Sequence, residues 1–150
     1  MSNVLTPTSA LPIVFSSGFE SGNGELVSLS KTACGCDRVE VRMTADPWSA
    51  TDGHALQWFY FRLSHVRGRP VEVALVNAHE ATFAKAWEEY KVAASYGGED
   101  WFRVEDTQYR DGVLVWRLVP SRDCVSFAFF APYSSARRAQ LLADVLATAD

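Results

Sequence analysis

The chain has 150 residues, 48% of them hydrophobic and 21% charged, which is typical of one globular domain and not of a disordered chain. Its net charge of −4, with Lys and Arg scattered along the sequence, excludes the basic patch on which DNA or RNA binding normally depends. No apolar run approaches the roughly 18–20 residues that a membrane-spanning helix needs. We therefore expect neither a nucleic-acid nor a membrane partner.

The N-terminal segment lacks the features of a signal peptide. Residues 1–12 carry Ser, Thr and two Pro, and they predict a flexible leader without a basic start or a long apolar core. The chain contains three cysteines, and an odd count argues against a disulfide scaffold. These observations together predict a cytoplasmic protein with reduced thiols.

Short strands are predicted from Ile13 onward. Val39, Val41 and Met43 alternate with polar residues, as expected of a strand that buries one face. Similar segments, punctuated by Gly, Pro and Asp, lie at 13–19, 26–29, 56–64, 71–75, 101–104, 113–119 and 124–131. Residues 83–90 predict one or two helical turns. The spacing is typical of an antiparallel β-sandwich, here of about eight or nine short strands over residues 13–133.

One predicted strand contains an unbroken row of aromatic residues. The stretch LQWFYFRLS at 56–64 places four rings in succession: Trp58, Phe59, Tyr60 and Phe61. Successive side chains of a strand point to opposite faces of its sheet, so only one pair of rings can enter the core. Trp58 and Tyr60 are expected on the outer face, next to Arg62. Two large outward rings indicate a binding or docking surface unless a loop covers them.

The C-terminal residues 134–150 predict a helix. Ser134 or Ser135 is a suitable N-cap, and the residues that follow are good helix formers. An apolar stripe at helical spacing comprises Leu141, Leu142, Val145 and Leu146. The predicted fold class is therefore all-β, with an antiparallel sandwich followed by an amphipathic helix.

No residue pattern in the chain demands a catalytic or metal site. The three histidines, which lack the ligand spacing of a zinc hydrolase, are His54, His65 and His79. A Gly-x-Ser-x-Gly nucleophile motif is also missing. Cys34 and Cys36 are too closely spaced for a typical structural zinc site, and we interpret them as a reduced turn, with Cys124 in the core. We predict no catalytic residue and no metal ligand in this chain.

Several motifs in order nevertheless resemble a known family. They are FESGNGE (19–25), QWFYFRL (57–63), RGRPVEVALVNA (67–78), KAWEEYKVAASYGGEDWFRV (85–104), DGVL (111–114) and FAFFAPYS (127–134). This order is similar to that in the N-terminal domain of the cytosolic carboxypeptidases, a subfamily of zinc metallocarboxypeptidases. The resemblance runs from about residue 15 to about residue 142. It departs at Phe83-Ala84, where a Tyr-Pro pair is expected, which leaves the shape of that loop open.

The resemblance implies a β-sandwich followed by an α/β catalytic domain. That second domain carries the family's zinc ligands, a His and a Glu in an H-x-x-E motif with a second His downstream, and none of these maps onto a residue of this sequence. The parent protein is thus expected to be a zinc peptidase that removes C-terminal residues from peptides or proteins. Residues 134–150 would link toward its catalytic domain.

The expected function is that of a non-catalytic accessory domain. Its partners would be the catalytic domain of the same parent chain and a peptide or protein substrate. The surface expected to dock comprises Trp58, Tyr60 and Arg62, or the helix side chains Leu141, Leu142 and Val145. The alternative is a stand-alone module that binds carbohydrate or peptide on exposed aromatic rings. An enzyme complete in this chain is the weakest alternative, and an exposed strand edge or aromatic face would also allow two copies to pair.

Overall fold

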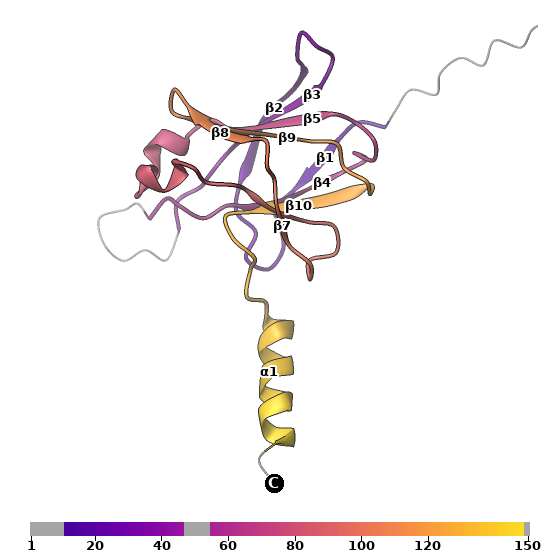
Figure 1. Cartoon of the computed structure of the whole chain (residues 1–150), viewed down its shortest axis with the longest axis vertical. Helices are drawn as coiled ribbons and strands as arrows, with labels where there is room; N and C mark the ends of the chain where they lie inside the picture. The colour runs from indigo at the N-terminus through magenta and orange to yellow at the C-terminus, as the bar shows by residue number, and fades with distance from the viewer. Residues whose placement is uncertain (1–10, 47–54, 149–150) are drawn as a thin grey trace, which may run out of the picture.

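The computed structural model describes residues 11–46 and 55–148, which form a β-sandwich with one projecting helix (Figure 1). The first sheet, called here the β4 sheet, has the order β1 (Val14–Ser16), β4 (Tyr60–Ser64), β10 (Cys124–Ala128), β6 (Ala93–Ser95) and β7 (Phe102–Arg103). The second, called the β5 sheet, has the order β2 (Glu25–Lys31), β3 (Asp37–Arg42), β5 (Val71–Leu75), β9 (Val113–Leu118) and β8 (Thr107–Arg110). Two 3-10 turns, η1 (Ala78–Glu80) and η2 (Ala84–Trp87), precede β6, and the helix is α1 (Ser135–Ala147).

The predicted all-β sandwich with a C-terminal helix is confirmed, and several details differ from the prediction. The strand expected at 56–64 begins only at Tyr60, so Trp58 and Phe59 lie before it. The described residues contain ten strands, compared with the eight or nine predicted. The two strands that were not predicted are β6 and β8. The β5 sheet is mixed, because β3 and β5 pair in parallel. After β3 the chain crosses to the other sheet to form β4 and then returns, so β5 runs in the same direction as β3. The predicted leader falls mostly on residues 1–10, which lie outside the described part.

The aromatic row is divided between the core and the outside as the strand period requires. Phe59 and Phe61 are fully buried, and Phe59 stacks on Trp116 of β9 with 5.9 Å between ring centroids. Trp87 of η2 closes this cluster from the side, and its indole Nε1 donates to the carbonyl of Ala78 at 2.9 Å. These rings join the two sheets, because each sheet contributes aromatic side chains to the same contacts.

Two asparagines fix the end of strand β3 by hydrogen bonds to its backbone. Asn77 is buried; its amide nitrogen donates to the carbonyl of Met43 at 3.0 Å, and its side-chain oxygen accepts from the N–H of Met43 at 2.9 Å. Asn23 is half-buried and makes the same pair of bonds to Thr44, at 2.9 and 3.0 Å. The backbone groups at the end of β3 are thereby satisfied without a neighbouring strand.

Candidate functional site

The predicted outer aromatic residues lie together on the outside of the β4 sheet. Trp58 lies just before β4, while Tyr60 and Arg62 are the first and third residues of β4. All three are half-buried, because the neighbouring Phe59 and Phe61 occupy the core. Together with rings contributed by other segments they form a surface that we call the aromatic face, comprising Phe19, Trp58, Tyr60, Arg62, Trp101 and Phe130.

The rings of the aromatic face pack against one another. Phe19 lies edge-on to Tyr60 at 4.8 Å, and Trp101 approaches Tyr60 at 5.9 Å between centroids. Trp58 lies 4.9 Å from Phe130, and its indole Nε1 donates to the carbonyl of Ser21 at 2.7 Å. Loop residues therefore cover the outer rings in part, while the ring of Phe130 remains exposed. The aromatic face is neither fully covered nor fully open to solvent.

Arg62 carries the positive charge of this surface. Its guanidinium lies 4.7 Å above the ring centroid of Phe19, and its Nε donates to the hydroxyl of Ser126 at 3.4 Å. A guanidinium stacked on an aromatic ring still presents donors to a carboxylate or a backbone carbonyl. Arginine and large aromatic residues are enriched where proteins contact one another, so this composition suits a docking surface.

Helix α1 begins at the edge of the aromatic face and is tied to it by a carboxylate. Glu20 accepts hydrogen bonds from the hydroxyl of Ser135 and, at 2.8 Å, from the Ser135 backbone N–H. These two bonds lower the pKa of Glu20 below its usual range. Ser134 is the N-cap and accepts from the N–H of Arg137 at 3.2 Å. The start of the helix is thus fixed to the sandwich by a negative group at its positive end.

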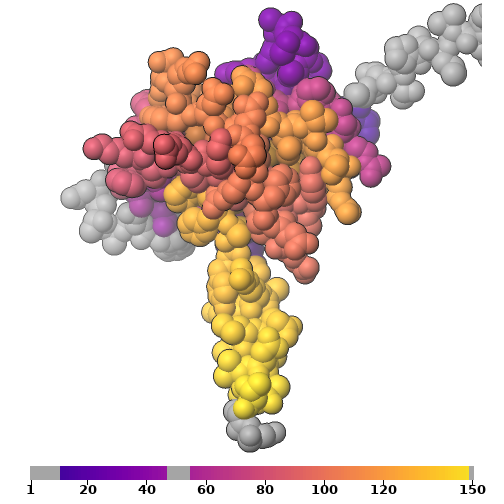
Figure 2. Space-filling view, viewed as in Figure 1, coloured from indigo at the N-terminus to yellow at the C-terminus, as the bar shows by residue number. Residues whose placement is uncertain are grey.

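The rest of α1 stands away from the sandwich. The three stripe residues predicted to dock, at exposed fractions of 54%, 56% and 55%, are Leu141, Leu142 and Val145. No residue of the helix is buried, and the space-filling view shows it projecting alone from the described chain (Figure 2). Among residues 11–46 and 55–148, no helix has both the length and the apolar character needed to cross a bilayer.

Two grooves lie near the start of the helix. One, of about 530 Å³, lies between the sandwich and α1 and is lined in part by Trp101, Pro132, Arg137 and Gln140. The other, of about 690 Å³, is lined in part by Asn23, Thr44, Trp58, Phe130 and Tyr133. Surface hollows beside exposed apolar side chains are places where a second folded surface can fit.

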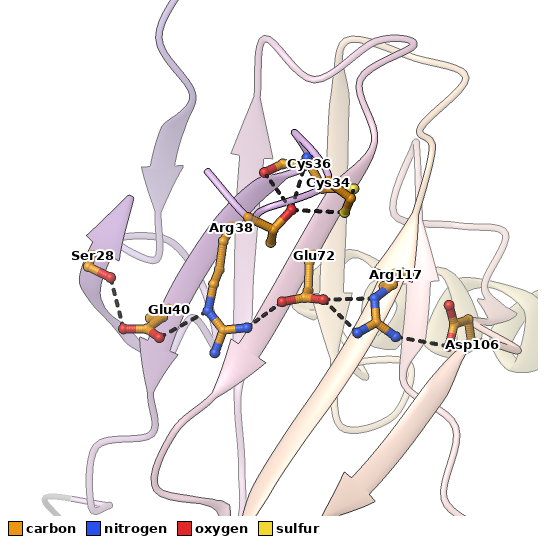
Figure 3. Close-up of polar contacts among 9 residues, drawn as sticks. Ser28, Cys34, Cys36, Arg38, Glu40, Glu72, Asp106 and Arg117 are labelled. Atoms are coloured by element: carbon orange, nitrogen blue, oxygen red, sulfur yellow. Dashed lines mark hydrogen bonds and ion pairs between the residues drawn. The ribbon is translucent and has the colours of Figure 1, made fainter. Parts of the chain in front are cut away.

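The opposite surface, on the β5 sheet, carries a row of paired charges (Figure 3). Glu72 of β5 is only 7% exposed and accepts from Arg38 of β3 on one side and from Arg117 of β9, at 2.6 Å, on the other. Glu40 extends the row, with 3.1 Å between its oxygen and the Arg38 Nε, and the Ser28 hydroxyl and this guanidinium lower its pKa. These carboxylates are engaged by arginines, so the row stabilises the sheet and offers no free acid or base. Residue spacing alone did not predict it.

The described residues provide no metal centre. No three His, Cys, Asp or Glu side chains within residues 11–46 and 55–148 group closely enough to hold an ion. The ring Nδ1 of His65 contacts the carbonyl of Pro12 at 3.0 Å, and that of His79 contacts the carbonyl of Gly112 at 3.2 Å. His54 lies outside the described residues.

Comparison with known proteins gives the family. The model of the cytosolic carboxypeptidase N-terminal domain matches residues 15–130. The chain belongs to this family. The resemblance found in the sequence motifs is therefore confirmed, and the matched segment spans the sandwich and ends before α1.

Solved structures and a curated relative agree with this assignment. A metallo-carboxypeptidase from Burkholderia cenocepacia is 31% identical with a TM-score of 0.79, over 89% of this chain and 33% of that one. A metallo-carboxypeptidase from Pseudomonas aeruginosa, in complex with (2-guanidinoethylmercapto)succinic acid, is 33% identical with a TM-score of 0.75, over 89% and 34%. An uncharacterised protein of Zymomonas mobilis is 36% identical over 87 residues, which are 58% of this chain and 23% of that protein. The chain spans about a third or less of the length of the proteins it matches.

The loop in which this carboxypeptidase N-terminal domain departs from the family motif has a defined shape. Phe83 and Ala84, which stand where a Tyr-Pro pair is expected, are the N-cap and the first residue of the 3-10 turn η2. The N–H of Phe83 donates to the side-chain oxygen of Gln57 at 2.9 Å, while its ring is exposed. The departure leaves Trp87 in the core, so the loop still supports the sandwich.

Proposed function

We propose that this chain is the non-catalytic N-terminal domain of a cytoplasmic zinc metallocarboxypeptidase that removes C-terminal residues from peptides or proteins. It would support the folding of the catalytic domain or shape the access of substrate to it. The partner is the catalytic domain of the same parent chain, docked on α1 and the aromatic face. The observation that carries the proposal is the exposed apolar stripe of α1. The helix that bears it begins at the edge of the aromatic face.

The helix needs a partner for physical reasons. An isolated helix of 13 residues is marginal in water, and most helix stability in proteins comes from packing of an apolar side. The stripe residues Leu141, Leu142 and Val145 find no packing partner in the described chain. A domain seated against the stripe would supply that packing. Contacts between domains of one chain commonly bury about 600–1,500 Å².

The zinc of the proposed parent would be held outside the described residues. The similar structures from Burkholderia cenocepacia and Pseudomonas aeruginosa are metallo-carboxypeptidases. The described residues of this chain lack a ligand cluster that fits the ion. In this proposal the catalytic domain holds the zinc and cleaves the peptide, and the N-terminal domain contributes through contact.

Leu142→Glu is expected to destabilise the parent protein while leaving the stability of the 150-residue chain almost unchanged. Glutamate keeps a good helix propensity, so α1 is retained. In the 150-residue chain the free energy of unfolding should change by no more than about 0.5 kcal/mol, because Leu142 is exposed. In the parent protein the same change should cost about 1.5–3 kcal/mol, because a buried leucine is lost. Thermal unfolding followed by circular dichroism measures the first effect, and a lowered temperature of half-inactivation of the peptidase reports the second.

Ala143→Glu is the matched control for this experiment. Residue 143 lies on the same helix but away from the stripe, so the same added charge should leave the parent unchanged. If Leu142→Glu and Ala143→Glu inactivate the parent at the same temperature, the stripe does not dock and the proposed contact is wrong.

The alternative function, a module that binds carbohydrate or peptide, is favoured by one observation, the groove lined by Trp58, Phe130 and Tyr133. If the aromatic face serves docking, we expect the tryptophan fluorescence of the chain to stay constant during titration with oligosaccharides or acidic peptides. A saturable fluorescence change that Trp58→Ala abolishes would instead support the binding module.

A further inference from the structure

The turn between β2 and β3 brings two thiols together at the tip of an exposed hairpin. The Sγ atoms of Cys34 and Cys36 lie 3.3 Å apart, and the hydroxyl of Thr32 lies 3.0 Å from the Cys34 sulfur. The turn is closed by the Gly35 N–H, which donates to the Thr32 carbonyl at 2.9 Å, and Gly35 has a φ of +86°. A residue with a Cβ is strained at that angle, so glycine permits the reversal that brings the sulfurs together.

From this geometry we propose that Cys34 and Cys36 form a thiol–disulfide exchange site that reacts with low-molecular-weight disulfides. Cys34 is exposed and is the attacking thiol, and Cys36 is half-buried and is the resolving thiol. The site lies at the far end of the hairpin from the aromatic face and is independent of the proposed docking function. Figure 3 shows the two sulfurs beyond the row of paired charges on the β5 sheet.

The environment distinguishes the two thiols. Hydrogen bonds from the Thr32 hydroxyl, first, and then from the Cys36 thiol lower the pKa of Cys34 to about 7. The hydrogen bond with Cys34 raises the pKa of Cys36. Cys34 is therefore partly a thiolate at neutral pH while Cys36 keeps its proton, and the thiolate is the nucleophile in exchange.

The charged groups around the pair are few. Glu72 of β5 acts on Cys36 and favours its protonated form, and Arg117 of β9 interacts with Cys34. Lys31 and Asp37, which flank the turn, are paired with each other at 2.7 Å. The Thr32 hydroxyl thus remains the main contributor to thiolate stability.

The exchange proceeds in two balanced steps. The Cys34 thiolate attacks one sulfur of a small disulfide R–S–S–R; a Cys34–S–R bond forms, the S–S bond of the reagent breaks, and one R–S⁻ leaves. Cys36 then loses its proton and attacks the Cys34 sulfur; the Cys34–Cys36 bond forms and the second R–S⁻ leaves. Two protein thiols are oxidised, one small disulfide is reduced to two thiols, and the two protons pass to the departing thiolates.

The test uses oxidised glutathione and the 150-residue chain carrying Cys124→Ser, which removes the remaining cysteine. After acid quenching and alkylation of free thiols, intact-mass spectrometry should show a product that is lighter by two hydrogens and carries no glutathione. With Cys36→Ser added, the chain should accumulate one glutathione on Cys34. With Cys34→Ser added, reaction at Cys36 should be at least roughly tenfold slower at pH 7.

Thr32 provides a second readout that a mere surface thiol would not give. In the 150-residue chain that carries only Cys124→Ser, the rate of exchange should be half-maximal near pH 7, in line with the pKa of Cys34 of about 7. Thr32→Val should move this midpoint upward toward the ordinary thiol range of about 8.5, and Thr32→Ser should leave it in place. Accumulation of glutathione adducts without loss of the two hydrogens would overturn the proposal, and so would equal rates at Cys34 and Cys36.

Discussion

Phe59→Ala is expected to lower the free energy of unfolding by about 3–5 kcal/mol, as measured by urea denaturation of the chain. Phe59 is fully buried and contacts Phe61, Trp87 and Trp116, so its removal leaves a cavity that residues of both sheets line. Close-packed interiors relax only partly around such a cavity, and the lost contacts add to the lost transfer energy.

Trp58→Ala is the control for this prediction because Trp58 precedes Phe59 in the chain and points the other way. Its ring is half-buried, and we expect a loss of about 1–2 kcal/mol. If the two substitutions destabilise the chain equally, the aromatic face acts as a second core, and its assignment as a docking surface fails.

Asn77→Ala is expected to destabilise the chain by about 2–5 kcal/mol, because it leaves both the N–H and the carbonyl of Met43 buried without a partner. Each unsatisfied buried group costs about 1–3 kcal/mol, and the small alanine also leaves the space of the amide unfilled. Denaturation in urea gives the change in free energy.

Asn23→Ala provides a matched comparison of the same chemistry at lower burial. Asn23 makes the equivalent two backbone bonds to Thr44, the next residue, and accepts a third from the Thr44 hydroxyl, but it is half-buried, so water can replace the lost partner. We expect a loss of about 0.5–1.5 kcal/mol. A cost for Asn23→Ala that equals that of Asn77→Ala would show that burial does not control the effect.

Local patterns were sufficient to predict much of the fold. Strand β5 covers Val71–Leu75 as predicted, because the turn residues RGRP precede it and β-branched and apolar residues recur at every second position. Helix α1 covers Ser135–Ala147, where helix formers and an N-cap serine coincide. The separation of Trp58 and Tyr60 from Phe59 followed from the strand period alone.

The missed features depend on contacts between distant residues or on weak local signals. Strand β6 has only three residues, and β8 is mostly polar, so neither shows a clear period. The pairing of Glu72 with Arg38 and Arg117 joins residues 34 and 45 positions apart. The same limit applies to the candidate site: the strand period predicted which rings face outward but not the loop residues that cover them.

The order in which the strands pair has a consequence for the speed of folding. Strand β4 pairs with β1 on one side and with β10 on the other, and β10 is the last strand among the described residues. The middle of the β4 sheet therefore cannot close on a ribosome until nearly the whole sandwich has been synthesised. Such non-local pairing is characteristic of chains that fold in milliseconds to seconds and that expose unpaired edges in the meantime. The nascent chain thus passes through a long interval in which chaperone binding or aggregation competes with closure of the sandwich.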